Sequence, residues 1–441
     1  MSNTEMQNQE AAEPIGKWSL SMAWWSLFSA MFWLYLSAAS AAAYGPKATV
    51  SGLVLTIVSY GVVNALLATY SLRTGNTVQS VSQLLFGKVG ATIASLLIAV
   101  TALYYGVFEG SVIAHTLEVQ FGGNIKVWYA ICVAYAVPLA FGGVRDWLDR
   151  LNGFLLPFYV VGLVALVVFA TVKQGYPTGW LTAPALGSSV PGWLGSYAIF
   201  MGVWVMMMFT MDFASMGRSE DADFHRRATF GPLFYACTFG INGLIGIYVV
   251  TAFGSGGTEG GVVEAVLGSL GIFGVILIVI SQTRINTANY YLASSNFENV
   301  VKSVFGVDLP RIIWVVICGV AAFSLMLTDV LSYLLTAMAW QAVLIVAWAS
   351  VVIVRVALRR DWQGDLASDS DPALRPLAAA WFIASVVGVT LHQQTSFPAL
   401  SAVAPIITFA VGAGLGWLLL SFDRTRTAVE GAPTPRPLAA A

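Results

Sequence analysis

Long apolar stretches recur along the whole chain, and they restrict it to one class of fold. The sequence has 441 residues, of which 58% are hydrophobic and 10% are charged, whereas a soluble domain carries about 25% charged residues. Each stretch is long enough to cross the roughly 30 Å hydrocarbon core of a bilayer as a helix. The stretches lie at residues 18–45, 51–72, 89–119, 127–144, 153–173, 191–213, 229–254, 269–298, 310–328, 331–355, 376–391 and 398–422. We therefore expect an all-α polytopic membrane protein with 12 transmembrane helices.

The distribution of basic residues predicts the orientation of these helices. With the N terminus in the cytoplasm, 17 of the 21 Lys and Arg residues fall in inner loops and tails, and only Lys47, Lys126 and Lys173 fall outside. Cytoplasmic loops carry the excess of Lys and Arg in membrane proteins. The first 16 residues contain no basic residue and therefore lack the positive region of a signal peptide. We expect a multi-pass protein of the cytoplasmic (inner) membrane, with disordered cytoplasmic tails at residues 1–17 and 423–441.

Several classes of function find no support in the composition. The formal net charge of -1 predicts no nucleic-acid partner. The three cysteines (Cys132, Cys237 and Cys318) lie inside apolar segments without the spacing of metal ligands, and the three histidines are scattered. No zinc-hydrolase motif and no Ser/His arrangement is present. We expect no enzyme, no metal site and no cofactor other than a coupling ion, and the sequence indicates no obligatory protein partner.

The first and sixth stretches carry signs of broken helices. Residues 36–45 are mostly small and hydroxylated, and the sixth stretch begins with Pro191-Gly192 and has Gly202 near its middle. Because five helices separate the two stretches, two halves with this spacing have opposite orientations. Inverted repeats with a discontinuous first helix hold a substrate near the bilayer midplane. We expect repeats over residues 18–173 and 174–355 and two additional helices over 356–422, although small residues also serve close helix packing.

A carboxylate interrupts the third apolar stretch. Glu109 lies one helical turn after Tyr105, while Tyr104 and Phe108 share the neighbouring face. An ionisable group inside the membrane is a functional candidate by default. Glu109 could accept a coupling proton, bind a substrate amine or form a structural salt bridge with Arg284. The aromatic residues could stack on a ligand or pack the bundle.

The eighth stretch continues with polar residues where hydrocarbon is expected. An arginine at a helix centre costs roughly 2.5–3.5 kcal/mol to insert, so Arg284, Asn286 and Asn289 must face protein or a wet cavity. The two asparagines are three residues apart and point to the same side of a helix. Arg284 is about 200° away from Asn286 at 100° per residue, which predicts a different neighbour, namely carbonyl groups of the broken first helix. In the sixth stretch, each of five residues could line a pocket or pack the bundle, namely Trp204, Met206, Met207, Met208 and Phe209.

These residues resemble those of a known family. The run Ser281-Gln282-Thr283-Arg284-Ile285-Asn286, followed by Asn289, resembles the eighth helix of purine-cytosine permeases, members of the nucleobase-cation-symport-1 family. The stretch Asp212-Phe213-Ala214-Ser215-Met216-Gly217-Arg218 resembles the end of their sixth helix, and Tyr104-Tyr105-Gly106 stands where many members have Trp-Phe-Gly. The similarity runs from about Trp24 to Asp361. It implies a LeuT-type fold of ten core helices plus two, which transports a nucleobase or related planar heterocycle together with a cation.

The resemblance also implies a set of site residues. Tyr104 would be one stacking aromatic and Trp204, or a neighbour in the broken sixth helix, the other. Asn286 or Asn289 would read the amide edge of the substrate, together with backbone at residues 37–41. The full set of predicted substrate-binding residues is Ser37, Ala38, Ser40, Tyr104, Phe108, Glu109, Trp204, Met207, Asn286 and Asn289.

Two departures from the family pattern affect the coupling ion and the substrate. Sodium-coupled members tend to have consecutive hydroxyl residues where this chain has Arg284-Ile285. A guanidinium at that position would supply the charge that sodium brings, so we predict a proton-coupled symporter with Glu109 and Arg284 as its coupling residues. Tyr104 in place of Trp leaves the identity of the heterocycle open. The alternatives are a sodium-coupled nucleobase symporter, an amino-acid or amine transporter of the same fold, a membrane-embedded enzyme, and a channel or receptor.

Overall fold

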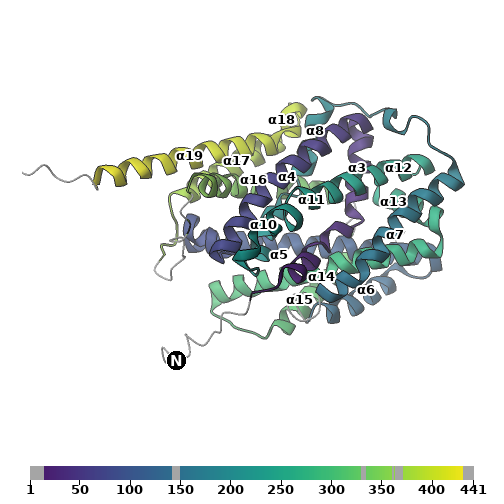
Figure 1. Ribbon diagram of the computed structural model, residues 1–441, viewed down its shortest axis with the longest axis horizontal. Coiled ribbons are helices and arrows are strands. Elements are labelled where there is room, and N and C mark those ends of the chain that lie inside the picture. Colours follow the sequence, from purple (N-terminus) through teal and green to yellow (C-terminus); the bar gives the residue numbers. More distant parts are fainter. Residues whose placement is uncertain (1–13, 142–148, 329–333, 360–361, 363–370, 431–441) are drawn as a thin grey trace, which may run out of the picture.

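The computed structural model describes residues 14–141, 149–328, 334–359, 362 and 371–430, which form a helical bundle (Figure 1). Its first half comprises α2 (Lys17–Trp24), η1 (Leu27–Ser29), α3 (Phe32–Tyr44), α4 (Pro46–Thr74), α5 (Val78–Phe121), α6 (Ile125–Leu139), α7 (Asp149–Gln174) and η3 (Trp180–Thr182). The second half comprises α8 (Gly192–Met201), α9 (Val205–Ala214), η4 (Ser219–Asp221), α10 (Ala222–Phe224), η5 (His225–Thr229), α11 (Pro232–Tyr235), η6 (Ala236–Ile241), α12 (Asn242–Phe253), α13 (Glu259–Leu270), α14 (Ile272–Phe305), α15 (Arg311–Met326) and α16 (Leu334–Leu358). Helices α17 (Leu377–His392), α18 (Pro398–Ala402) and α19 (Ala404–Glu430) follow.

The lengths of the apolar helices confirm a multi-pass membrane protein. Within the described residues, seven helices are long and apolar enough to span a bilayer, and the bent pairs α2–α3 and α8–α9 raise this to nine. Helices α6, α15 and α17 are apolar and shorter, at 10–17 residues. The predicted total of 12 spans remains a prediction. The predicted division into two five-helix repeats and two additional helices also remains a prediction.

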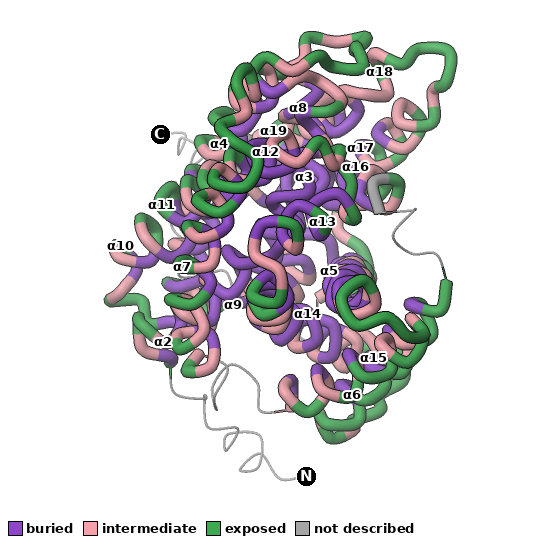
Figure 2. The backbone as a smooth tube through the Cα atoms, turned by 90° about the vertical axis from the view of Figure 1, so that its right-hand side faces the viewer, coloured by how far each residue is buried: buried purple, intermediate pink, exposed green. Residues whose placement is uncertain are grey.

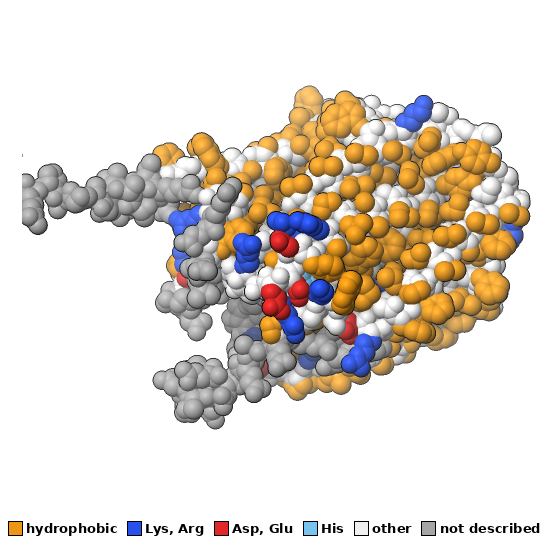
Figure 3. Space-filling view, viewed as in Figure 1, with side chains coloured by type: hydrophobic (Ala, Val, Ile, Leu, Met, Phe, Trp, Pro, Cys, Tyr) orange, Lys and Arg blue, Asp and Glu red, His pale blue; other side chains and the backbone are white. Residues whose placement is uncertain are grey.

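Burial separates an inner from an outer set of helices. Figure 2 shows buried backbone along α3, α9 and α14 and many exposed residues on α6, α7 and α15. Exposed side chains of α7 include Phe154 and Val161, and α15 exposes Val320. Figure 3 shows that apolar side chains cover much of one face, while most of the charged ones gather in one area. Since such an apolar surface is stable against lipid and not against water, α7 and α15 face the bilayer.

The first helix breaks at a different place from the one expected. The segment Lys17–Ser29, which comprises α2 and η1, is bent by 40° relative to α3, and the residues outside the α-helices are 25–31 instead of the expected 36–45. The physical cause of this break lies in two serines that bond to their own backbone. Ser26 Oγ donates to Ala23 O and Ser29 Oγ donates to Ser26 O, each at 2.7 Å. Such local hydrogen bonds compete with the helix ladder.

The small residues of α3 serve close packing. Ser40 donates to Ser196 on α8 at 2.9 Å and lies 3.2 Å from the Thr49 hydroxyl on α4. Ser37 faces α12, where a Cβ on Gly243 would come within 2.8 Å of its hydroxyl oxygen. The alternative explanation of these residues, helix packing, is therefore the correct one.

The second break lies where the sequence predicts it. Helices α8 and α9 differ by 44°, and residues 202–204 separate them. Gly202 is at the break, as expected. At the far end of α9, Asp212 accepts a hydrogen bond of 2.8 Å from the backbone N–H of Val78, the first residue of α5. Asp212 thus satisfies one of the free N–H groups at the start of that helix.

Three boundaries differ from the predicted ones. Helix α5 begins at Val78, ahead of predicted residue 89, and continues through a kink at Gly87, whose φ is 86°. The predicted N-terminal tail, of which residues 1–13 lie outside the described part, is docked from residue 14 on, because Ile15 donates to Met216 O at 2.8 Å. The last helix continues to Glu430, past predicted residue 422. Residues 431–441 of the predicted C-terminal tail lie outside the described residues.

The contact between α3 and α12 leads to a stability prediction. A Cβ on Gly246 would lie 2.3 Å from Leu34 O, so we expect Gly246→Ala to lower the free energy of unfolding by about 1–3 kcal/mol. Gly260 on α13 is exposed, and a Cβ added there would meet nothing within 4 Å, so Gly260→Ala is the matched control. Thermal unfolding in detergent measures both. Equal midpoints for the two variants would contradict the close backbone approach.

Candidate functional site

A small cavity lies where the two broken helices meet in the middle of the bundle. Its lining comes from the first break and α3, from the second break and α9, and from α5 and α14. These residues are Leu27, Ala30, Phe32, Trp33, Tyr105, Glu109, Val203, Met206, Phe209, Ile285 and Asn289. We call it the central cavity. Its volume is about 20 Å³, room for about one water molecule, so the bundle must widen here to admit an organic ligand.

Four polar side chains hold the freed backbone of the first break. Arg284 Nη2 donates to Trp25 O at 3.1 Å, and Asn242 Nδ2 donates to Phe28 O at 2.8 Å. Ser281 Oγ donates to Ser29 O at 2.5 Å, and the N–H of Met31 donates to Gln282 Oε1 at 3.1 Å. Backbone groups away from water need such partners. The polar run of α14 therefore stabilises the break.

Glu109 is connected to this break through Gln282. Gln282 Nε2 donates to Glu109 Oε2, while the Oε1 atom of the same amide accepts from Met31 and, at 3.1 Å, from Ser281. A change in the charge of Glu109 therefore acts on a side chain that binds the broken helix. Hydrogen bonds to an ionised acceptor are about twice as strong as neutral ones, so protonation of Glu109 weakens this connection.

Arg284 is fully buried and occupies the expected position against the broken helix. Its bond to Trp25 O matches the predicted neighbour, a carbonyl of the first helix. The alternative of a salt bridge is not realised, because Glu109 and Arg284, both described, form no ion pair and Glu109 bonds to Gln282 instead. The Nε and Nη1 atoms of Arg284 find no acceptor among the described residues. The guanidinium therefore places a positive charge at the break.

The two asparagines of α14 lie in different environments. Asn289 lines the central cavity, and neither polar atom of its buried amide has a partner among the described residues. Asn286 faces α5 between two glycines, since a Cβ on Gly106 would lie 3.4 Å from its Oδ1 and a Cβ on Gly110 would lie 3.7 Å from its Nδ2. A buried amide without partners is costly. The Oδ1 atom of Asn286 also lacks a partner among the described residues, but of the two asparagines only Asn289 lines the central cavity. Asn289 is therefore the one available to a ligand there.

Besides Asn286, seven of the predicted site residues lie outside the lining of the central cavity. Tyr105 lines it in place of Tyr104 and accepts a hydrogen bond from Gln341 at 3.0 Å. Trp204 packs against Phe409 of α19 and Tyr60 of α4, with ring centroids 5.3 and 6.2 Å apart. The sulfur of Met207 accepts a hydrogen bond from Asn64 on α4. Ser37 and Ser40 face the neighbouring helices α12 and α8, as described above. At the second break and in α9, Trp204 and Met207 point away from the central cavity, and their neighbours Val203 and Met206 line it instead.

The remaining two predicted residues lie on the other side of the site. Phe108 lines a cavity of about 10 Å³ together with Tyr35 of α3 and Glu259 of α13. Ala38 lies nearby, since a Cβ on Gly257, just before α13, would meet its carbonyl oxygen at 2.7 Å. Burial raises the pKa of the Glu259 carboxyl, and its hydrogen bond with Tyr35 opposes this rise. Helix α13 thus lines this second small cavity together with α3 and α5.

Sequence reasoning missed several residues of the site. Phe32 and Trp33 contribute rings to the cavity, and Ser281 and Gln282 bind the break. The signal for the last two was present, because a Ser-Gln pair in hydrocarbon needs partners just as Arg284 does. The rings carried no signal, since aromatic residues are frequent in all the apolar stretches.

Two bent helix pairs, one at the start of the chain and one near its middle, with a cavity between their breaks, are typical of the LeuT-type fold of secondary transporters. Solved structures confirm this fold. Mhp1 in an inward-facing conformation aligns over 94% of this chain and 92% of its own, with a TM-score of 0.75 and 16% identity. A second structure shows Mhp1, described as a nucleobase-cation-symport-1 family transporter, in a closed conformation with bromovinylhydantoin bound. It aligns over 97% of this chain and 95% of its own, with a TM-score of 0.67 and 17% identity.

Other transporters share the fold. The substrate-bound outward-open state of a Na+-coupled sialic acid symporter aligns over 92% of this chain and 89% of its own, with a TM-score of 0.60 and 11% identity. No model of a protein family and no curated protein matches the sequence. The predicted resemblance to the nucleobase-cation-symport-1 family is therefore confirmed in the fold. The structural relatives are membrane transporters and not enzymes.

Proposed function

We propose that this chain is a proton-coupled symporter that imports a nucleobase or a related planar heterocycle by alternating access. One observation carries the proposal. The central cavity combines aromatic rings with one carboxyl group, Glu109, and one amide without partners, Asn289. Rings bind the faces of a flat heterocycle, and an amide pairs with its N–H and C=O edge.

The aromatic lining supports a flat substrate. Phe32 and Trp33 come from the first break, Tyr105 from α5 and Phe209 from α9. The rings of Phe32 and Tyr105 are 5.6 Å apart, a typical distance for packed aromatic pairs. A planar substrate that separates these rings would gain a stacking surface on each side. Mhp1, which has the same fold, was solved with a hydantoin, a planar heterocycle, bound.

Glu109 and Gln282 support coupling to a proton. A proton that enters the central cavity with the substrate can neutralise Glu109. The hydrogen bond that Gln282 donates to Glu109 then becomes weaker. Gln282 passes this change to Met31 in the break. Since the two halves of the first helix pivot at this break, the protonation state of Glu109 would favour one orientation of α2 and α3 over the other.

Arg284 supports independence from sodium, and this leads to a prediction. Its guanidinium holds the carbonyl of Trp25, as a bound cation would. Replacing Na+ by choline should therefore change the initial uptake rate by less than about twofold, below the 5- to 150-fold effect typical of coupled ligands. Uptake into proteoliposomes at a constant pH gradient measures it. Saturable activation by Na+ would contradict the role of Arg284 and favour a sodium-coupled symporter.

A screen of detergent-purified protein tests the substrate class. A ligand that binds only the folded state raises the unfolding temperature by mass action. We expect purines, pyrimidines or hydantoins to do so, and counterflow exchange of the labelled compound in proteoliposomes to show carrier-mediated transport. Stabilisation without counterflow would instead indicate a receptor.

An amine or amino-acid transporter is the second candidate, and Glu109 is the observation that favours it. A carboxylate in an aromatic-lined cavity can pair with a substrate ammonium, which the rings also attract. Stabilisation by amines but by no heterocycle in the same screen would support this function over the first.

We also infer the orientation in the membrane. The positive-inside rule places the N-terminal side of the bundle, with α2 and α10, in the cytoplasm, and the protein in the inner membrane. Arg218, Arg226 and Arg227, between α9 and α11, lie on this side. To test this orientation, a single cysteine is introduced at Arg227 and treated with a membrane-impermeant thiol reagent. We expect it to react in inverted vesicles and not in right-side-out vesicles.

A further inference from the structure

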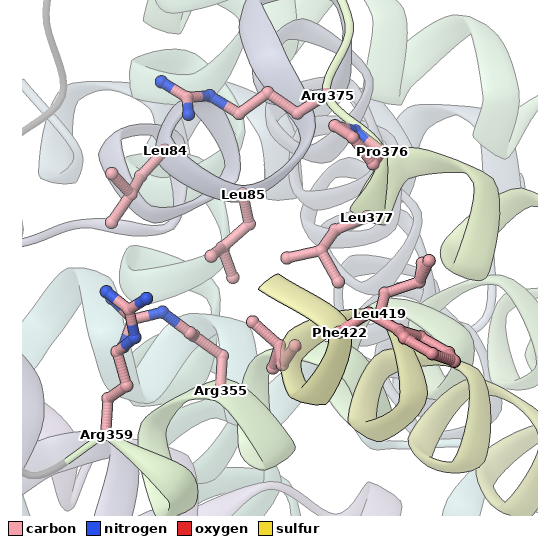
Figure 4. Close-up of a pocket in the computed structure, with 10 residues that line it drawn as sticks. Leu84, Leu85, Arg355, Arg359, Arg375, Pro376, Leu377, Leu419 and Phe422 are labelled. Carbon is pink, nitrogen blue, oxygen red and sulfur yellow. The ribbon is translucent and has the colours of Figure 1, made fainter. Parts of the chain in front are cut away.

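Two cavities larger than the central one open at the surface of the bundle. The first, of about 420 Å³, lies between α5, α16, α17 and α19 (Figure 4). Its arginines do not form one open site, because Arg375 extends away from the other two in Figure 4 and pairs with Asp371, while Arg355 and Arg359 interact further within the protein. The second cavity, of about 540 Å³, is a groove between α7, the first break, η6 and α12. We call it the apolar groove.

Two rows of side chains border the apolar groove. On α7, Val160, Val164 and Val168 recur every four residues and are all exposed. Residues at this spacing form one ridge along a helix. The facing row comes from η6 and α12 and repeats at the same spacing, with Cys237, Ile241 and Ile245. The bilayer-facing surface is therefore hollowed between α7 and α12.

The floor of the groove belongs to the first break. The rings of Trp25 and Phe28 line it, and Phe28 is buried. Arg284 binds the backbone carbonyl of Trp25, and Asn242 binds that of Phe28. The indole N–H of Trp25 donates to Ala228 O at 3.2 Å, so its polar atom is satisfied and the ring presents an apolar surface to the groove. The same two residues thus form the floor of the groove and part of the break.

Contacts beneath the groove hold its walls in place. Tyr159 on α7 donates to Asn242 Oδ1 on α12 at 2.8 Å, and Nδ2 of the same amide donates to Phe28 O at 2.8 Å. Helix α7 also packs closely on α14, since a Cβ on Gly162 would lie 2.3 Å from a methyl group of Leu277. Because α7 is attached to its neighbours at both points, the groove is part of the fold.

The chemistry of the groove selects an apolar occupant. Every described residue that lines it has an apolar side chain, and water needs polar partners that such a site does not offer. Its volume lies within the range of about 300–1,000 Å³ that is typical of ligand-binding pockets. Along α7 it extends from Leu156 to Val168, or about 18 Å at roughly 1.5 Å per residue. This length is close to half of the roughly 30 Å hydrocarbon core, which one acyl chain covers.

We propose that the apolar groove binds one acyl chain of a membrane phospholipid, and that this chain braces the first break. The chain contacts Trp25 and Phe28, whose rings move when α2 and α3 change their angle. It therefore binds one orientation of the break better than the other and shifts the population toward it. This second effect rests on the proposed alternating access, whereas binding of the chain does not. The test accordingly measures binding and stability without a transport assay.

Photocrosslinking in proteoliposomes tests the binding. The probe is phosphatidylcholine with a photoactivatable diazirine in one acyl chain, present as a small fraction of unlabelled phosphatidylcholine, and mass spectrometry locates the crosslinks. Val161 is 67% exposed on α7 outside the groove, so it reports contact with bulk lipid. We expect crosslinks at the groove residues of α7 and η6 to exceed those at Val161 about tenfold. Equal crosslinking at both places would overturn the proposal in favour of unspecific lipid contact.

A matched pair of variants locates the chain. Val164→Trp places a large ring in the groove from a position that is 60% exposed, so no packed neighbour has to move. Val161→Trp adds the same ring outside the groove. We expect the excess of groove crosslinks to disappear in Val164→Trp and to persist in Val161→Trp. An excess that persists in both variants would overturn the proposal.

Cys237 allows a test of the brace. It is partly exposed at the groove, whereas Cys132 and Cys318 are buried. In detergent-purified protein, decyl methanethiosulfonate attaches a ten-carbon chain to this thiol, and methyl methanethiosulfonate attaches one carbon. We expect the decyl group to raise the unfolding temperature above that of the methyl-modified protein, and neither reagent to change it in Cys237→Ala. An equal or lower unfolding temperature with the decyl group would show that a chain in the groove does not stabilise this arrangement of the break.

Discussion

Replacing Glu109 by Gln will abolish substrate accumulation driven by a pH gradient. A pH difference of one unit is worth about 1.4 kcal/mol per proton and so supports roughly tenfold accumulation. The glutamine keeps the shape of the side chain and can still accept from Gln282, but it cannot bind a proton. We therefore expect the concentration ratio across the membrane of proteoliposomes to fall from about ten to about one at this gradient.

Exchange is the control for this experiment. Counterflow of labelled substrate needs no net proton movement, so Glu109→Gln should retain it if the variant still binds substrate. Glu264→Gln on α13, which removes a carboxylate at an exposed position, should behave like the unmodified protein in both assays. Accumulation that persists in Glu109→Gln would show that another group accepts the coupling proton.

The sequence predicted the fold well, because long apolar helices in a bilayer are set by hydrophobicity and length alone. The break in the sixth stretch was also expected, from Pro191-Gly192 and Gly202, and Gly202 lies at it. The break in the first did not, because the small residues at 36–45 looked weaker than the aromatic run before them. In fact Ser26 and Ser29 weaken the helix, and partners distant in sequence hold the resulting gap. The residues around the break contain no trace of these partners, and of the partners only Arg284 was assigned to the first helix, from the cost of its charge in hydrocarbon.

The site was predicted in its chemistry more than in its geometry. The cost of polar groups in hydrocarbon singled out Glu109, Arg284 and Asn289, and all three lie at the central cavity or its break. The sequence did not show which of two adjacent residues faces the cavity: Tyr104 was expected there, and Tyr105 lines it. Tyr104 and Tyr105 are one residue and 100° apart on the same helix, and only the packing of α5 against the rest of the bundle decides which one faces the cavity.

Asn289 and Asn286 also lie close together on one helix, and only Asn289 lines the central cavity. A substitution of Asn289 therefore tests the substrate site directly. Its amide lines the central cavity without a partner among the described residues, so a substrate that donates one hydrogen bond and accepts another can satisfy both of its polar groups. Two such bonds are worth about 1–3 kcal/mol together. We therefore expect Asn289→Ala to weaken substrate binding by roughly 5- to 150-fold, as measured by the ligand dependence of the unfolding temperature.

The matched control is Asn286→Ala, one helical turn earlier. Asn286 packs between Gly106 and Gly110 of α5, so its loss should lower stability and leave the affinity for substrate within about twofold, since the side chain makes no contact with the cavity. Without ligand, Asn289→Ala should be as stable as the unmodified protein or more so, because it removes a buried amide that lacks partners. The opposite ranking, with affinity lost in Asn286→Ala and kept in Asn289→Ala, would place the substrate against α5 and outside the cavity between the two breaks.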